Sequence, residues 1–148
     1  MKSLHLSFLI LLLAGVLHGA YAQKSEINSQ NGKAISGYDP VGYFKLGKPV
    51  LGNAEFKASY GGVEWYFSSK ENMDLFLKSP NDYLPQYGGY CAFGVAGGYK
   101  AKISPEAWSI VNGKLYLNYN KSVQADWLKE RDTMIQKADK NWTEVKKK

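Results

Sequence analysis

Residues 54–77, AEFKASYGGVEWYFSSKENMDLFL, decide the fold because they contain the signals for a hairpin and for a helix that follows it. Apolar and polar residues alternate along 54–59 and again along 63–67, which is the period of a strand with one buried face. The pair Gly61-Gly62 between these runs is typical of a tight turn. The segment therefore predicts an antiparallel hairpin.

The helix after this hairpin is predicted from its first residues. Ser68 stands three positions before Glu71, the spacing of a capping box, and apolar residues then recur at helical intervals. Ser79-Pro80 predicts a second, short helix, because proline is favoured at the first helical position.

The C-terminal part contains a second hairpin and a closing helix. Asn112-Gly113, a strong hairpin signal, separates two runs that read as strands. Residues 121–142 are expected to form one helix with a single apolar face. The fold class is therefore α+β, with a small antiparallel sheet of two hairpins, short helices, and a C-terminal helix packed on the sheet.

The N-terminus has the three parts of a secretory signal peptide. Lys2 provides a positive start, residues 4–16 are almost entirely apolar, and Ala20-Tyr21-Ala22 is a small-residue cleavage site. We expect cleavage between Ala22 and Gln23. The protein is then exported, periplasmic or secreted, and its mature chain has no transmembrane segment.

The remaining chain divides into three expected regions. Residues 23–33 are polar and read as a flexible segment, 34–142 form the folded domain, and 143–148 are a basic tail. Cleavage removes one of the 19 Lys and Arg residues and none of the 13 Asp and Glu residues. Because the remaining charges are interspersed, we interpret the excess of positive charge as a solubility feature and expect no nucleic-acid partner.

The histidine and cysteine counts restrict the chemistry. Both histidines, His5 and His18, lie in the expected leader, so the mature chain would contain none. This excludes Ser-His-Asp and Cys-His catalysis and histidine-based metal sites. Cys91 is the single cysteine, so no internal disulfide forms. We do not expect an enzyme.

Several motifs together resemble the YHS domain, a short module found beside heavy-metal transporters and oxygenases. The similarity covers Gly37 to Tyr83, and the rest of the chain resembles a stand-alone exported branch of that family. The motifs are Gly37-Tyr38-Asp39-Pro40-Val41, Tyr60-Gly61-Gly62, Trp65-Tyr66-Phe67-Ser68-Ser69 and the stretch from Phe76 to Tyr83.

The chain departs from this family at the metal-binding positions. Metal-binding YHS modules carry cysteines after Asp-Pro-Val and in a Phe-Cys-Ser turn. Here those positions hold Gly42 and Ser68, and the nearby second position is Asn72 or its neighbour. The classical thiolate site is therefore absent, and its role is not transferred to these residues.

Cys91 is the remaining candidate for soft-ligand chemistry, and it lies between two Gly-Gly pairs. One hypothesis is a binding module for a soft metal ion such as copper, with Met73, Met134 or a carboxylate such as Asp39 completing the site. Met73 is more typical of a helix core than of a ligand, and Asp39 is more typical of a structural Asp-Pro turn. Cys91 itself is also typical of a buried core residue.

Two other functions stay open. Cys91 could cycle through oxidised forms with a thiol of a partner protein, because the chain has no second cysteine. Alternatively, the protein recognises a protein or a glycan through tyrosines in loops. The candidate pocket comprises Tyr38, Tyr87, Gly88, Gly89, Tyr90 and Gly94.

Overall fold

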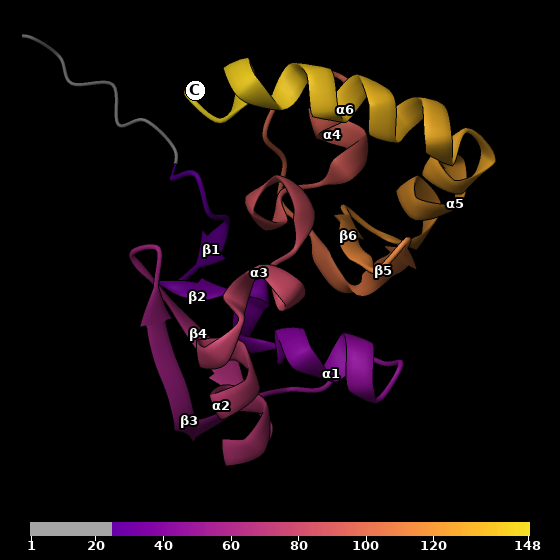
Figure 1. The fold of residues 1–148 in the computed structure, drawn as a ribbon. Helices are drawn as coiled ribbons and strands as arrows, with labels where there is room; N and C mark the ends of the chain where they lie inside the picture. Colours follow the sequence, from indigo (N-terminus) through magenta and orange to yellow (C-terminus); the bar gives the residue numbers. More distant parts are fainter. Residues whose placement is uncertain (1–24) are drawn as a thin grey trace, which may run out of the picture.

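The computed structural model describes residues 25–148 and shows an α+β fold (Figure 1), as predicted. The signal peptide and its cleavage site between Ala22 and Gln23 lie outside the described residues. The strands are β1 (Ser29–Gln30), β2 (Lys33–Ala34), β3 (Asn53–Tyr60), β4 (Val63–Phe67), β5 (Ser104–Val111) and β6 (Lys114–Asn118). The helices are η1 (Ile35–Gly37), α1 (Pro40–Lys45), α2 (Lys70–Lys78), α3 (Pro80–Tyr83), η2 (Gln86–Gly89), α4 (Ala92–Ala96), α5 (Lys121–Lys129) and α6 (Arg131–Val145).

Both predicted hairpins are present, but they form two sheets. Strands β3 and β4 belong to a four-stranded sheet of order β1-β2-β4-β3, whereas β5 and β6 pair only with each other. The expectation of a purely antiparallel sheet is wrong, because β2 pairs parallel to β4 through Lys33 and Glu64. Strand β2 spans the predicted boundary between the flexible segment and the domain, and it joins the sheet through a contact between residues far apart in the sequence.

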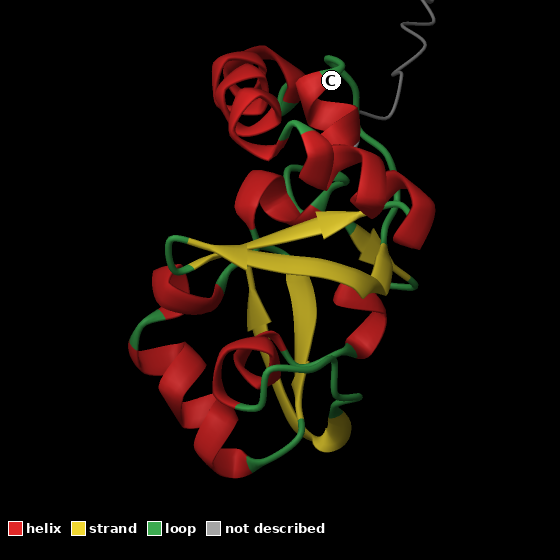
Figure 2. Ribbon diagram, turned by 90° about the vertical axis from the view of Figure 1, so that its right-hand side faces the viewer, coloured by secondary structure: helices red, strands yellow, loops and turns green. Residues whose placement is uncertain are grey.

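The two sheets lie between helices. Figure 2 shows the strands in the middle of the molecule, with helices at both ends and the hairpins running in different directions. Tyr43 connects α1 to the β5–β6 sheet. Its hydroxyl donates to the carbonyl oxygen of Pro105 in β5 at 3.0 Å, and its ring contacts Trp108 of the same strand.

Helices α1 and α2 each begin directly after an N-cap residue whose side chain accepts a hydrogen bond from the helix backbone. Asp39-Pro40, predicted as a turn, begins α1, with Asp39 as the N-cap and Pro40 at the first helical position. For α2 the predicted cap, Ser68, is wrong by one residue: Ser69 accepts from the backbone N–H of Asn72 at 3.1 Å. Ser68 is not available as the cap, because its hydroxyl donates to Asp39.

The closing helix is interrupted, so the expectation of one helix over 121–142 is wrong. Glu130 has a non-helical backbone (φ −127°, ψ 33°) and separates α5 from α6. This break lets α6 pack along α4, and it brings Trp127 of α5 and Ala138 of α6 into the same buried cluster.

The buried side chains form two clusters. The first is built on the β3–β4 hairpin and contains Trp65, Phe67 and Phe76. The second lies under α5 and α6 and contains Tyr116 and Trp127. Ring contacts hold each cluster together, for example between Tyr116 and Trp127 with centroids 5.4 Å apart.

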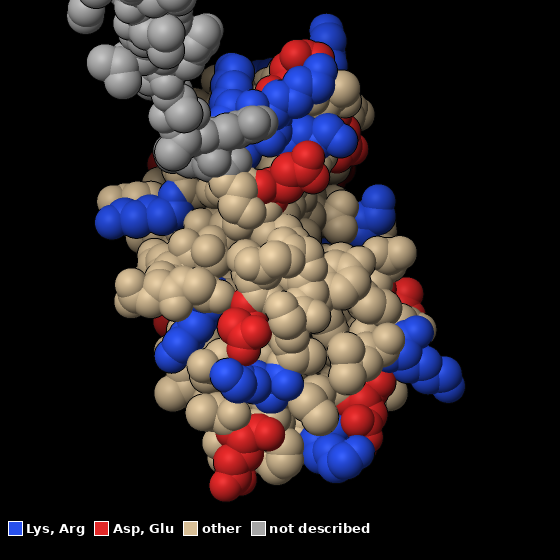
Figure 3. All heavy atoms as spheres, turned by 90° about the vertical axis from the view of Figure 1, so that its left-hand side faces the viewer, with Lys and Arg blue, Asp and Glu red and all other residues tan. Residues whose placement is uncertain are grey.

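The surface carries charges of both signs. Figure 3 shows Lys and Arg side chains interleaved with Asp and Glu on one face, with a broad uncharged area between the upper and lower groups. In the part of the chain that the structure describes, no helix has the length and apolar character to cross a membrane.

Candidate functional site

Asp39, a predicted metal ligand, is completely buried at the start of α1. Its Oδ1 accepts from the backbone N–H groups of Val41 at 2.8 Å and Gly42 at 3.3 Å, as an N-cap carboxylate does. The following proline has no N–H to offer, which leaves these two as the capped donors.

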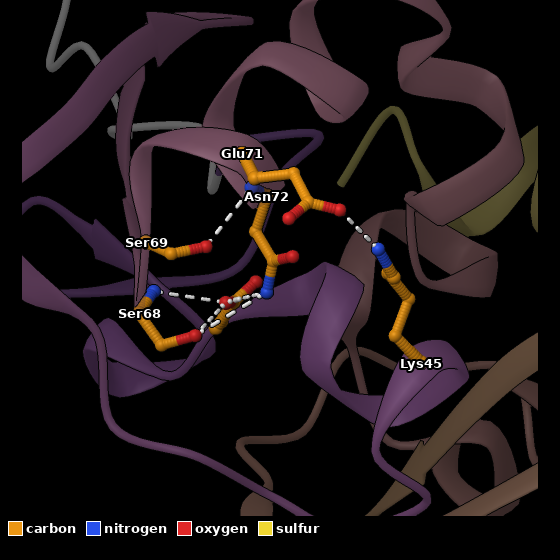
Figure 4. Close-up of polar contacts among 6 residues, drawn as sticks. Lys45, Ser68, Ser69, Glu71 and Asn72 are labelled. Atoms are coloured by element: carbon orange, nitrogen blue, oxygen red, sulfur yellow. Dashed lines mark hydrogen bonds and ion pairs between the residues drawn. The ribbon is translucent and has the colours of Figure 1, made fainter.

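The second oxygen of Asp39 faces the start of α2. Oδ2 accepts from the Ser68 backbone N–H at 2.9 Å, from Ser68 Oγ at 2.7 Å and from Asn72 Nδ2 at 2.7 Å. Figure 4 shows Ser68 and Asn72 directed toward each other, with Ser69 and the Lys45–Glu71 ion pair nearby. Protein donors thus occupy both oxygens, and Asp39 ties α1 to α2.

Gly42, Ser68 and Asn72, which the sequence resemblance set against cysteine positions (Asn72 or its neighbour for the last), lie together around Asp39. Gly42, Ser68 and Asn72 each provide a hydrogen-bond donor to Asp39. We call Asp39, Gly42, Ser68 and Asn72 the Asp39 cluster. Its members are joined by hydrogen bonds to Asp39, and none of them has a thiol that could bind a soft metal ion.

Cys91, the main predicted ligand, lies in the first core with 2% of its surface exposed. It precedes α4, and its backbone N–H donates to the carbonyl oxygen of Ala101 at 3.1 Å. Its Sγ lies 3.7 Å from Oδ1 of Asn118, within reach of a weak S–H hydrogen bond. The thiol is therefore packed as a small core residue.

Asn118 determines the surroundings of this thiol. Its Oδ1 also accepts from the backbone N–H of Phe93 at 3.2 Å, which fixes the orientation of the amide. The sulfur consequently faces an acceptor oxygen, whereas a thiolate needs nearby donors or positive charge. Among the described residues, Nδ2 of the fully buried Asn118 has no hydrogen-bond partner.

Met73, the third predicted metal ligand, lies on α2. Met73 is half-buried against the first core, in agreement with the alternative that it is a core residue. Within residues 25–148, no three His, Cys, Asp or Glu side chains form a group that could hold a metal ion.

The predicted pocket residues separate into different places. Tyr38 pairs with Leu51 beside the first sheet, and Gly94 packs against Tyr99. Gly88 approaches the N-terminal segment so closely that a Cβ there would collide with the carbonyl oxygen of Glu26. These glycines are explained by internal packing.

Asn28 locks the turn that contains Gly88 and Gly89. Its backbone N–H donates to the carbonyl oxygen of Gly88 at 2.8 Å, and its Nδ2 donates to that of Gly89 at 3.0 Å. Tyr90 also holds the N-terminal segment, because its hydroxyl donates to the carbonyl oxygen of Ser25 at 2.6 Å. The segment predicted to be flexible thus makes specific contacts from Ser25 onward.

Two of the predicted pocket residues line clefts: Tyr90 lines one beside the N-terminal segment, and Tyr87 lines another beside α6. The backbone of Tyr87 is left-handed (φ 57°, ψ 39°), which is unusual for a residue with a side chain. Its hydroxyl donates to Asp139 Oδ1 at 2.8 Å, and its ring contacts Trp142 with centroids 6.0 Å apart. The cleft, of about 280 Å³, is lined by Asn81, Leu84, Pro85, Gln86, Tyr87, Asp139 and Trp142.

The chemistry of this Tyr87 cleft follows from its lining. Burial, and then the hydrogen bond to Asp139, raises the pKa of Tyr87 above its ordinary value, so its hydroxyl stays a donor at neutral pH. Asp139 is the one charged residue in the lining, beside the aromatic ring of Trp142 and two amides. Such a cleft can bind a small molecule through an aromatic face and a carboxylate.

Sequence reasoning named Tyr87 but missed Asp139 and Trp142 as site residues. In the sequence Trp142 is one apolar residue at the end of the expected closing helix, and Asp139 is one of several carboxylates on that helix. No local pattern singles them out, because the site forms only when α6 packs beside η2.

Residues 41–87 match the family model of the YHS domain. This match confirms the resemblance to the YHS module, whereas the resemblance of the rest of the chain to a stand-alone exported branch stays a prediction. It begins two residues after Asp39 and ends at Tyr87, so it includes neither Cys91 nor the residues that α6 contributes to the cleft. No curated protein and no solved structure matches the chain.

Proposed function

We propose that this chain, which carries a YHS domain at residues 41–87, is a ligand-binding module whose ligand occupies the Tyr87 cleft. The observation that carries this proposal is the left-handed backbone of Tyr87. That conformation costs a residue with a side chain about 1–2 kcal/mol. Strained residues of this kind cluster at functional sites, where the surrounding structure holds them in place.

The surroundings of Tyr87 support a binding role. Its ring packs between Tyr116 and Trp142, and its hydroxyl is held by Asp139. Tyr87 is therefore rigid and prearranged at the cleft. A prearranged site loses less conformational entropy when a ligand binds.

The indole N–H signals of the tryptophans test this proposal by NMR. We would titrate the protein with choline, glucose, glycine, acetate and inorganic phosphate, and assign the signal of Trp142 with the variant Trp142→Phe. At least one probe is expected to shift the Trp142 signal. Trp127, buried outside the cleft, is the internal control. If none of the probes shifts Trp142, the proposal fails.

We also propose that the protein acts after export, with its leader removed between Ala22 and Gln23. The apolar run of residues 4–16 and the small-residue site support this. The intact mass of the protein purified from its native host checks it. A mass that includes residues 1–22 would contradict export with cleavage.

A second candidate function is binding of a soft metal ion, such as copper, through Cys91. The family match favours it, because YHS domains are associated with possible metal binding. Cys91 is the only thiol, but with 2% exposure it can bind a metal ion only if the start of α4 opens. Thiol redox exchange with a partner protein requires the same opening.

Titration with Cu(I) against a competing chelator tests this second function. If Cys91 is a ligand, Cys91→Ser loses the bound copper. Met73→Leu or Met134→Leu loses it only if that methionine completes the site. Equal copper binding by Cys91→Ser and the unaltered protein would contradict a role for Cys91.

A further inference from the structure

We infer that the ligand of the Tyr87 cleft is a small organic cation, an inference that rests on the proposed function. The chain carries 19 Lys and Arg against 13 Asp and Glu, yet the one charged residue in the lining of this cleft is Asp139. The cleft is therefore a local site of negative charge on a basic protein. Its charge attracts a cation and repels carboxylates and phosphates.

Asp139 has an oxygen left for a ligand. Its Oδ1 accepts from Tyr87, whereas its Oδ2 makes no hydrogen bond or ion pair within residues 25–148. Lys137 and Lys140 flank Asp139 in the helix, but neither lines the cleft or pairs with Asp139. A positively charged group in the cleft would be the first cation to contact this carboxylate.

Trp142 supplies the second feature of a cation site. It lies three residues after Asp139 on α6, the spacing that places two side chains on the same face of a helix. Its ring is half-buried and contacts the rings of Tyr87 and Tyr90, with centroids 6.0 and 6.4 Å away. Tryptophan attracts cations more strongly than the other aromatic side chains, and aromatic sites of this kind bind quaternary ammonium groups.

The size of the cleft limits the ligand. Its volume of about 280 Å³ is at the lower end of ligand pockets, so it accommodates a head group of a few carbon atoms. Asn81 and Gln86 belong to the lining, and amide side chains of this kind can bond to a hydroxyl or carbonyl group attached to that head group. The ligand class is thus a small amine or quaternary ammonium compound with a polar substituent.

Choline and 3,3-dimethylbutan-1-ol test this inference, because they have the same shape and differ in charge. We expect choline to shift the Trp142 indole signal with an affinity about tenfold higher than that of the neutral alcohol, a difference of about 1.4 kcal/mol. Equal affinities would overturn the inference while leaving a binding cleft. If neither compound and none of the earlier probes shifts the Trp142 signal, both the inference and the proposed function are wrong.

Asp139→Asn is the matched variant, because the asparagine oxygen can still accept from Tyr87 while the charge is lost. It is expected to remove the preference for choline over the alcohol. Asp132→Asn, also on α6 but outside the cleft and paired with Arg131, is the control for general charge effects. If Asp132→Asn weakens choline binding as much as Asp139→Asn, the inference is wrong. Thermal unfolding of both variants verifies that they are folded.

Discussion

The Asp39 cluster and the Cys91–Asn118 pair are both buried and both hold the start of a short helix, but they differ in how fully their polar groups are bonded. The oxygens of Asp39 accept five hydrogen bonds, from Val41, Gly42, Ser68 and Asn72. Asn118 uses its oxygen and leaves its Nδ2 without a partner among the described residues. Both regions are buried, and they differ in whether their buried polar atoms all have hydrogen-bond partners.

The comparison also assigns different roles to the two predicted metal ligands. Asp39 would have to give up bonds to the helix that it caps before it could coordinate an ion. Cys91 would break only a weak S–H interaction with Asn118 Oδ1 before it could bind an ion. A metal ion cannot reach the Cys91 sulfur in the closed structure, because the core covers it.

The largest expected effect comes from Asp39→Ala. This variant leaves the buried donors around Asp39 unpaired and removes the cap of α1, so we expect it to lower the free energy of unfolding by about 3–5 kcal/mol. Urea unfolding followed by tryptophan fluorescence measures this. Asp82→Ala, which removes an exposed carboxylate, is the control and should cost under about 0.5 kcal/mol.

A loss below about 1 kcal/mol for Asp39→Ala would contradict the closed network. Should that variant fail to fold, Asn72→Ala removes one donor and keeps the cap. It is expected to cost about 1–2 kcal/mol.

Alkaline pH is expected to have the next largest effect. Burial is the main cause that raises the pKa of Tyr43 and of Tyr87, with the carboxylates of Glu106 and Asp139 adding to it. The pKa of each tyrosine is higher in the folded state than in the unfolded chain. The contribution of the two neutral hydroxyls to stability is therefore fully present below about pH 10, and it is lost as the pH rises further. Each tyrosine should lower stability by about 1.4 kcal/mol per pH unit there.

Unfolding free energies between about pH 9 and pH 11 measure this decline. Tyr43→Phe and Tyr87→Phe should each make the slope shallower, because phenylalanine does not ionise. Tyr99→Phe, at an exposed position, should leave the slope unchanged. A stability that stays constant across this range would show that the two hydroxyls are not held as described.

Cys91→Ala is expected to have a smaller effect. It removes a buried sulfur and a weak hydrogen bond, which should cost about 1 kcal/mol in the same urea experiment. The thiol of the native protein should also react with a thiol reagent on the order of a hundredfold more slowly than in the unfolded chain. Fast labelling of the native protein would mean that α4 opens, and it would strengthen the soft-metal and redox hypotheses.

The smallest effect is expected at the surface, for the ion pair between Lys70 and Asp74. Its Nζ–Oδ2 distance is 2.6 Å, but the two side chains are 70% and 55% exposed. Lys70→Ala should change stability by no more than about 0.5 kcal/mol. A double-mutant cycle with Asp74→Ala isolates the pair, and a coupling above about 1 kcal/mol would contradict this estimate.

Local patterns predicted the two hairpins, because alternation and glycine turns act over a few residues. The N-cap of α2 was predicted one residue too early. The Ser68 hydroxyl instead donates to Asp39, which is 29 positions earlier in the chain. Tyr87 was named as a pocket residue without Asp139, its partner 52 positions later. Each error involves a contact between residues far apart in the sequence.

The sequence by itself determined the strands of both hairpins and restricted thiol chemistry to Cys91, because periodicity and residue counts do not depend on how the chain packs. Only the tertiary structure decided that the hairpins form separate sheets, that the closing helix breaks at Glu130, and that Tyr87 meets Asp139 and Trp142. No glycine or proline marks the break near Glu130. The packing of α6 against α4 stabilises it there, and contacts of that kind depend on distance in space and not along the chain.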